Sequence, residues 1–223
     1  MKSSALLGIL ALGFAANASA NLVTNGSFET FAGTFGGDGG AQLISTSTTL
    51  TGWSIEGGEI AVLKTPNSYN LSASDGVNFL DLAGYSNTGF PKGLSQTLSG
   101  LTVGSTYAFS MDIGIRNGPC VGGGNNCNGP VQASAKIGTT SQTFTENSST
   151  TGNVWGTFGF NFLATSPTMK LTIDGISLPA GHQFIGLDNA SVNVVSVPEA
   201  ETYALILVGL GALGLVVRFR KRA

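Results

Sequence analysis

Few residues of this chain can do chemistry: it has one histidine, two cysteines and twelve acidic side chains among 223 residues. His182 stands in the loop-like segment SLPAGHQF without a nucleophile motif beside it, which gives Ser-His-Asp and Cys-His arrangements no support. Nominal carboxylate pairs for glycoside hydrolysis are Glu56 with Glu59 and Asp75 with Asp81. Acidic residues near strand ends are common, and neither a P-loop nor a dinucleotide fingerprint occurs. We therefore expect no enzymatic activity, with a secreted glycan-active hydrolase using an acidic pair as the alternative.

The two cysteines lie close together in the segment RNGPCVGGGNNCNGP, as Cys120 and Cys127. In an oxidising compartment this spacing favours one local disulfide, which would add at best about 2–3 kcal/mol. Two free thiols and half of a zinc site are the alternatives. A zinc site lacks further ligands in this sequence, so we expect the disulfide.

Charge and composition limit the class of the central region, residues 21–197. It contains ten acidic and five basic side chains, a net charge of −5, which argues against nucleic acid as a partner. Low charge together with abundant Gly, Ser, Thr and Asn is typical of an all-β extracellular domain.

Stretches that alternate apolar with small or polar residues predict short strands separated by Gly-rich loops. The predicted strand segments are Leu22–Val23, Gly52–Ile55, Val77–Leu82, Leu94–Leu98, Tyr107–Ile113, Gln132–Ile137, Gln142–Thr145, Val154–Leu163, Met169–Ile173 and Ile185–Val195. Strands of this length and spacing predict a single β-sandwich rather than a βαβ array.

The first twenty residues have the pattern of a secretory signal peptide. Lys2 supplies the positive charge, Ala5 to Ala16 form an apolar stretch, and Ala18-Ser19-Ala20 place small residues before Asn21. We expect residues 1–20 to be removed on export, with cleavage before Asn21.

The C-terminal end combines an apolar run with a basic cluster. The run from Tyr203 to Val217 would rise about 22 Å as a helix, and flanking side chains that snorkel would extend it toward the roughly 30 Å hydrocarbon core. We expect a transmembrane helix at about 203–219. Its basic residues should remain cytoplasmic and leave the domain on the far side of the membrane; they are Arg218, Arg220, Lys221 and Arg222.

The segment VPEAETYALILVGLGALGLVVRFRKRA, residues 198–223 with the preceding valine, resembles the PEP-CTERM sorting signal of Gram-negative bacteria. In that family exosortase, an integral-membrane protease, cuts at a Pro-Glu-Pro motif before the helix. Pro198 and Glu199 match the motif, and Ala200 stands where the second proline is usual. The resemblance implies exosortase as a partner, transient anchoring in the inner membrane, and then release to the cell surface or extracellular matrix. A plain tail anchor is the alternative.

Five motifs in order, NLVTNGSFE, GWSI, DGVNFLDLAG, GLSQTLSGLTVGSTYAFSMDIG and FIGLDNASV, resemble the family of domain of unknown function 642. That family is similar to galactose-binding-like jelly rolls, so the resemblance implies a jelly-roll β-sandwich and polysaccharide binding. It also implies a structural calcium shared by the first and last strands, with Glu29 and Asp188 as the carboxylate ligands. The alternative is that both carboxylates only bind neighbouring backbone groups.

Aromatic rings in polar loop sequence are candidates for stacking on sugars. Tyr69, Tyr85 and Phe90 meet this description, whereas Trp53 and Trp155 are flanked by strand-like residues and are expected in the core. The sequence thus predicts a non-catalytic exported protein that binds polysaccharide. A purely structural coat component without a ligand is a further alternative.

Overall fold

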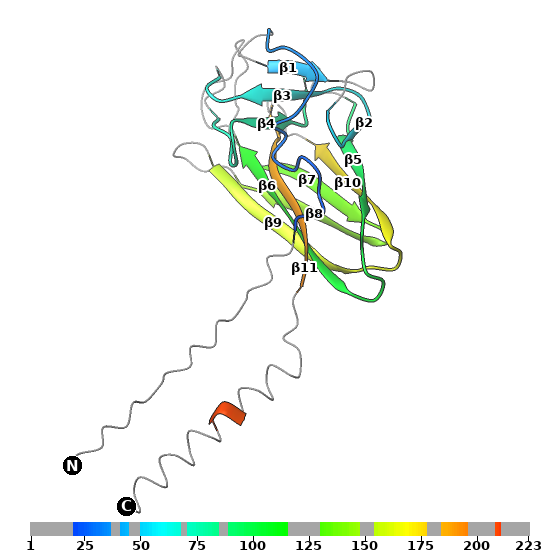
Figure 1. The fold of residues 1–223 in the computed structure, drawn as a ribbon. Coiled ribbons are helices and arrows are strands. Elements are labelled where there is room, and N and C mark those ends of the chain that lie inside the picture. Colours follow the sequence, from blue (N-terminus) through cyan, green and yellow to red (C-terminus); the bar gives the residue numbers. More distant parts are fainter. Residues whose placement is uncertain are drawn as a thin grey trace, which may run out of the picture.

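The computed structural model describes residues 20–36, 41–44, 50–67, 71–84, 89–115, 130–147, 154–177, 184–195 and 208–210. These residues form an antiparallel β-sandwich of two sheets, which confirms the all-β prediction (Figure 1). Within the described residues, no helix is long and apolar enough to cross a membrane. The helix predicted at about 203–219 lies outside them, apart from Val208–Leu210.

One sheet has six strands in the order β1-β3-β4-β11-β6-β9. Their bounds are β1 Ala41–Ile44, β3 Ile60–Lys64, β4 Asn78–Asp81, β11 Gly186–Val194, β6 Thr106–Ile115 and β9 Val154–Leu163. The other sheet has five strands in the order β2-β5-β10-β7-β8. These are β2 Ser54–Glu56, β5 Lys92–Ser99, β10 Thr168–Ser177, β7 Val131–Ile137 and β8 Thr140–Glu146. Pairs such as β4–β11 and β5–β10 join strands far apart in sequence, as in Greek-key sandwiches.

The main core fills the space between the sheets because alternate residues of each strand point inward. In β6 these are Tyr107, Phe109, Met111, Ile113 and Ile115, all at most 4% exposed. Ring contacts join them to β9, for example Tyr107 stacked on Phe162 with centroids 5.7 Å apart. Trp53 is 7% exposed and packs against Phe28, which confirms its predicted place in the core.

A second, smaller core lies on the outer side of β3 and β4, away from the main core. It contains Ala61, Leu63, Leu71, Phe79 and Phe184, with Trp155 packed against it. Strand β3 is therefore buried on both faces, since Ile60 and Val62 belong to the main core. Its sequence IAVLK lacks alternation for this reason, and the sequence analysis did not predict it as a strand.

The N-terminal segment runs beside β11, but the prediction that Leu22–Val23 form a strand is wrong. These residues lie in bends, because isolated backbone hydrogen bonds, rather than a continuous β-ladder, hold the segment to β11. The Leu22 N–H donates to the Val192 carbonyl, and the Ala190 N–H donates to the Gly26 carbonyl, each over 2.9 Å. The first described residues and the end of β11 are thus side by side (Figure 1).

Candidate functional site

The outer face of the five-stranded sheet carries mainly polar side chains and glycine. We call it the open face. On β10 the inward residues are Met169, Leu171 and Ile173, so Lys170, Thr172 and Asp174 point outward. Register places the remaining members of the open face beside these three: Ser54, Glu56, Gly93, Ser95, Thr97, Gln132, Ser134, Lys136, Ser141, Thr143 and Thr145. Most of their side chains are exposed or half-buried.

Two carboxylates of the open face lie on either side of a glycine. Gly93 pairs with Glu56 on one side and with Asp174 on the other, so the Cα atoms of the two acids are about 10 Å apart, two strand spacings. A Cβ on residue 93 would stand 2.4 Å from the Asp174 Oδ1 atom and 2.1 Å from the Ile173 carbonyl oxygen. A larger residue at position 93 would therefore collide with β10.

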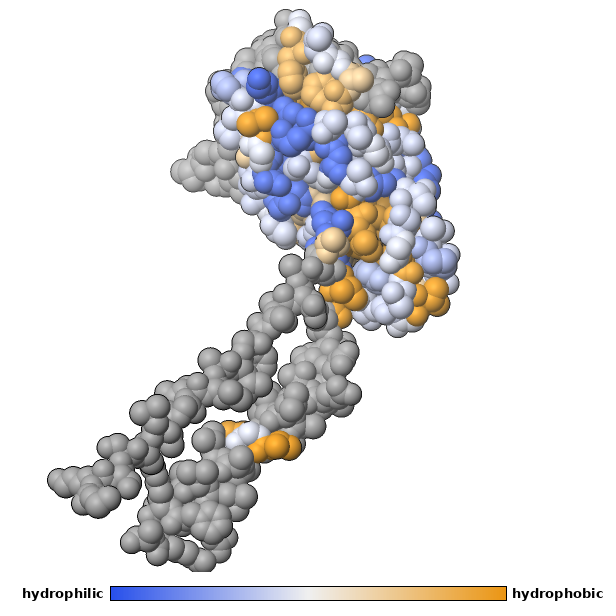
Figure 2. All heavy atoms as spheres, in the orientation of Figure 1, coloured by the Kyte–Doolittle hydropathy of each residue, from blue (hydrophilic) through white to orange (hydrophobic). Residues whose placement is uncertain are grey.

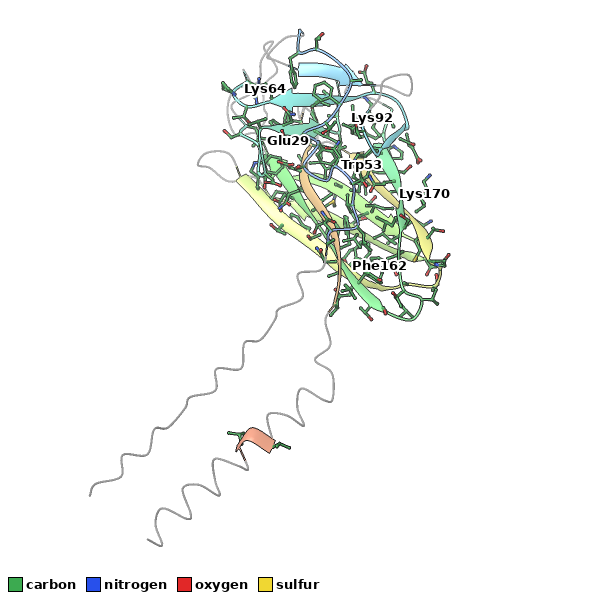
Figure 3. All side chains as sticks on the ribbon, viewed as in Figure 1. Glu29, Trp53, Lys64, Lys92, Phe162 and Lys170 are labelled. Atoms are coloured by element: carbon green, nitrogen blue, oxygen red, sulfur yellow. The ribbon has the colours of Figure 1, made fainter. Side chains whose placement is uncertain are left out.

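The two acids have different electrostatic surroundings. The Lys170 ammonium donates to the Glu56 Oε1 atom over 2.5 Å, and the Ser95 hydroxyl donates to the same atom over 2.6 Å. These bonds lower the pKa of Glu56. Burial, and then the negative charge of Glu56, raise the pKa of Asp174. In Figure 3, Lys170 points outward at the edge of the molecule, apart from Glu29.

The outer face of the six-stranded sheet is covered where it carries its acids. We call it the closed face. Residues 71–78 lie over β6 and β11, and Trp155 donates from its indole N–H to the Ser72 carbonyl over 2.8 Å. Trp155 was expected in the core; it is half-buried and packs edge-on against Phe79 in the second core.

Asp188 holds this covering segment through backbone amides. Its Oδ2 atom accepts from the N–H groups of Ser74 and Asp75 over 2.8 and 2.9 Å. Its Oδ1 atom accepts from the Asn189 N–H over 2.7 Å. The side chain is fully buried, and burial raises its pKa to about 7 against the effect of these bonds.

Asp112 is the partner of Asp188 across the β6–β11 ladder, and the sequence analysis missed it. Its Oδ2 atom accepts from the Ser74 hydroxyl and from the Asn189 side-chain amide, and its Oδ1 atom accepts from the Thr157 hydroxyl over 2.7 Å. A bulge between Asp188 and Ser191 gives Asn189 a φ of 50° and turns its amide onto Asp112. Ser74 thus binds both acids, one through its N–H and one through its hydroxyl.

Glu29 holds the other end of the covering segment. Its Oε1 atom accepts from the N–H groups of Val77 and Asn78, each over 2.8 Å. Gly76 has a φ of +69°, and a Cβ there would stand 2.3 Å from this oxygen, so the turn fits closely against the carboxylate. Glu29 and Asp188 therefore both bind backbone amides of residues 74–78, which is the alternative expected for them.

The calcium predicted at Glu29 and Asp188 stays a prediction. Next to Glu29, the Asn78 Oδ1 atom is buried and has no hydrogen-bond partner. A bound cation would satisfy this oxygen. Backbone N–H groups already donate to the carboxylate oxygens of Glu29 and Asp188, so a cation would have to share these oxygens with the hydrogen bonds. Within the ranges that the structure describes, no group of three or more acidic, histidine or cysteine side chains is placed to hold a metal ion.

Asp75 and Asp81 do not form a paired site, and Glu59 lies beside Gly84. Asp81 is 5% exposed and accepts from the N–H groups of Ala83 and Ile185, each over 2.9 Å. Burial raises its pKa to about 7, and Asp75 belongs instead to the exposed turn above Asp188. Glu56 is placed across from Asp174, a partner that alternation in the sequence MKLTIDG could have indicated.

Among the aromatic candidates, Phe90 is the one the structure describes. It is half-buried against the main core, and its ring centroid lies 5.8 Å from the Lys92 ammonium. It therefore closes one end of the sandwich rather than standing on the open face. Tyr69 and Tyr85 lie outside the described residues, as do Cys120, Cys127 and His182.

The sorting residues also lie outside the described part of the chain; they are Pro198, Glu199, Ala200, Arg218, Arg220, Lys221 and Arg222. The comparison with protein families covers them. A model described as the PEP-CTERM protein-sorting motif matches residues 196–222. The resemblance found in the sequence is thus confirmed, and the motif implies export and sorting to the cell surface.

Similarity to individual proteins is more distant. Halomucin of Haloquadratum walsbyi is 29% identical over 186 residues, which cover 83% of this chain and 2% of that protein. This chain therefore spans a small fraction of the curated relative it matches.

Among solved structures, an arabinose-bound MgGH51 α-L-arabinofuranosidase is similar at a TM-score of 0.49 with 18% identity, over 80% of this chain and 27% of that one. A putative sugar-binding protein of Bacteroides thetaiotaomicron is similar at 0.46 with 11% identity, over 79% and 100%. At TM-scores below 0.5, these similarities say nothing about what this chain binds.

The central region is matched as a whole by one family model. The model described as protein of unknown function (DUF642) covers residues 21–182, from the expected signal cleavage site to the segment before β11. This match spans more than half of the chain and the ten strands from β1 to β10. The chain belongs to the DUF642 family and carries a PEP-CTERM sorting motif at its C-terminal end.

Proposed function

We propose that this protein is an exported, non-catalytic surface or matrix protein whose sandwich binds a polysaccharide across the open face. Its tail serves as the sorting signal: exosortase cuts near Pro198-Glu199 after a helix at about 203–219 has held the protein briefly in the inner membrane. The signal peptide, residues 1–20, is removed before this step.

The observation that carries the proposal is the uniform chemistry of the open face. Its side chains are hydroxyls, one amide, two carboxylates and two ammonium groups, set in rows at strand spacing. Sugar hydroxyls both donate and accept hydrogen bonds, so such rows can bind them along a chain. Glu56 and Asp174 balance Lys136 and Lys170, which suits a neutral polysaccharide better than a polyanion.

The test is a glycan array probed with residues 21–197, together with an assay for release of reducing sugar. We expect binding to one neutral polysaccharide class without turnover. Replacing Lys136 and Lys170 with Ala together should weaken binding several-fold, while replacing exposed Val77 with Ala, at the rim of the closed face, should not. Silence on the array would favour a purely structural coat component.

A hydrolase is the second candidate because the pKa values of Glu56 and Asp174 are pushed apart, as in acid–base pairs of glycosidases. The open sheet surface favours binding, since general acid catalysis works best in a site that excludes water. If reducing sugar is released and Asp174→Asn abolishes the release while binding persists, the hydrolase replaces our proposal.

A structural calcium at Glu29 and Asp188 remains part of the proposal. The orphaned Asn78 Oδ1 atom supports it, since that oxygen would add one neutral ligand to the carboxylates. The ion would stabilise the turn that covers the closed face and would take no part in binding glycan.

A further inference from the structure

Three exposed apolar side chains lie at the end of the sandwich where β11 finishes. They are Val103, Leu163 and Val194, which are 59%, 55% and 36% exposed. We call this end, made of residues 100–106 and 163–168 with the end of β11, the terminal end. Backbone bonds join its parts: Gly104 N–H to the Ala164 carbonyl over 2.9 Å and Val195 N–H to the Thr106 carbonyl over 2.9 Å. In Figure 2, hydrophobic patches lie among neutral residues at this lower end of the sandwich, and others lie at its upper end.

The terminal end is also free of charge. The chain segments that meet there, residues 20–22, 99–106, 163–169 and 192–195, contain no Asp, Glu, Lys or Arg, and the exposed Lys170 follows directly after Met169. The acids of the domain, which has a net charge of −5, are placed farther up, for example Glu56, Asp81 and Asp188. A surface that carries anionic lipid would repel most of this domain but not its terminal end.

The length of chain beyond the sandwich fixes which end can face the membrane. Val195 is the last residue of the sandwich that the structure describes, its N–H donates to Thr106, and the apolar run begins at Tyr203. The eight residue steps between them span at most about 29 Å when fully extended. Part of that reach crosses the headgroup layer, so the end of β11 is held close to the bilayer.

We propose that the terminal end of the sandwich rests on the lipid surface of the membrane while the tail is still uncut. This inference rests on the proposed anchoring role of the tail. Val103 and Leu163 enter the interface, and the uncharged loops around them lie among the headgroups. The open face then stands away from the bilayer.

The chain offers a matched pair of positions for the test. Val103 and Val77 are the same residue type and are 59% and 48% exposed. The Val77 N–H donates to Glu29 near the covering turn, past Asp112 and Asp188 when counted from the terminal end. Val103 lies at the terminal end itself, past Tyr107. Asp112 and Tyr107 are five residues apart on β6, about 17 Å. Figure 3 shows Glu29 in the upper half of the sandwich and Phe162 near the terminal end.

The experiment uses the full-length protein in vesicles of phosphatidylethanolamine and phosphatidylglycerol that contain a headgroup spin label. A fluorescent amino acid replaces Val103 in one sample and Val77 in another. We expect the label at position 103 to be quenched at least threefold more strongly than the label at position 77. Adding Leu163→Glu, an exposed position that tolerates charge, should reduce quenching at 103 without changing the melting temperature.

Equal quenching at the two positions, in protein that floats with the vesicles, overturns this inference and leaves the anchoring proposal standing. Protein that does not float shows that the tail is no anchor, and the inference falls with that proposal. Glycan binding is measured separately on residues 21–197, so its failure leaves the quenching result unaffected. In that released domain we expect little quenching at either position, and strong quenching at position 77 would contradict the proposed orientation.

Discussion

The open and the closed face both place acids on outward positions of their strands, but they use these acids differently. On the open face Glu56 accepts hydrogen bonds from Ser95 and Lys170, and both Glu56 and Asp174 are only half-buried. On the closed face Asp112 and Asp188 are buried beneath residues 71–78. Acids under a covering segment stabilise the fold through backbone amides, whereas acids on a free sheet remain available to a ligand.

The largest effect should follow from removing the acid that holds the closed face. Asp188→Ala leaves the N–H groups of Ser74, Asp75 and Asn189 without an acceptor. We expect a loss of about 3–5 kcal/mol in the free energy of unfolding. Thr172→Ala on the open face should change it by less than about 0.5 kcal/mol. Urea denaturation of residues 21–197 measures both, and equal losses would remove the distinction between the faces.

Calcium should act on the closed face alone. A ligand that binds only the folded state adds RT ln(1 + [L]/Kd), about 2.7 kcal/mol at a hundredfold excess over Kd. Melting temperatures should rise with calcium and fall with chelator, and magnesium should substitute poorly. Glu29→Gln should abolish the shift, while Glu56→Gln on the open face should keep it. A wild-type domain indifferent to calcium and chelator would leave Glu29 and Asp188 as backbone-binding residues only.

The buried Asp81 should make stability depend on pH. Burial raises its pKa in the folded state to about 7, above its usual value, so between the two values the folded protein holds a proton that the unfolded chain has lost. Stability should therefore fall as pH rises from 5 to 8, by at most about 1.4 kcal/mol per pH unit from this group.

Asp81→Asn keeps an oxygen for the N–H groups of Ala83 and Ile185 and should remove the share of this pH dependence that Asp81 contributes. The share of Asp188, whose pKa is also raised to about 7, should remain. Denaturation midpoints at pH 5, 6.5 and 8 provide the measurement. An unchanged slope in the variant would mean that Asp81 is ionised throughout, balanced by the nearby Lys92.

The smallest effect on stability belongs to the ion pair of the open face. The side chains of Lys170 and Glu56 are 59% and 37% exposed, and exposed pairs contribute about 0–1 kcal/mol. Lys170→Met should barely change the urea midpoint, yet it should weaken polysaccharide binding. A large loss of stability would show that the open face is structural.

Alternation predicted most of the sandwich from the sequence. In β6 every second residue from Tyr107 to Ile115 is apolar and buried, so both the strand and its buried side were predictable. The strand β3 was not, because its two faces enter two different cores. The N-terminal segment shows the opposite error, since Leu22 bonds to β11 without continuing as a strand.

The candidate sites were predictable only where one segment carries the whole signal. Glu29 stands out in NGSFE, and residues 198–223 carry the sorting signal in one stretch. Asp112 and Ser74 become neighbours of Asp188 through the β6–β11 register and the course of residues 71–78, which no local pattern encodes. In the same way, Glu56 and Asp174 meet across Gly93 only when β5 pairs with β2 and β10.

The most direct test of the central claim is to map which backbone amides respond when the polysaccharide found on the array is added to residues 21–197. In ¹H–¹⁵N spectra, we predict shifts that concentrate on β5, β10 and β7, around Ser95, Thr172 and Ser134. Residues of the closed face, such as Ser74 and Asn189, should remain unchanged. Shifts confined to residues 71–78 and the β6–β11 ladder would contradict the account.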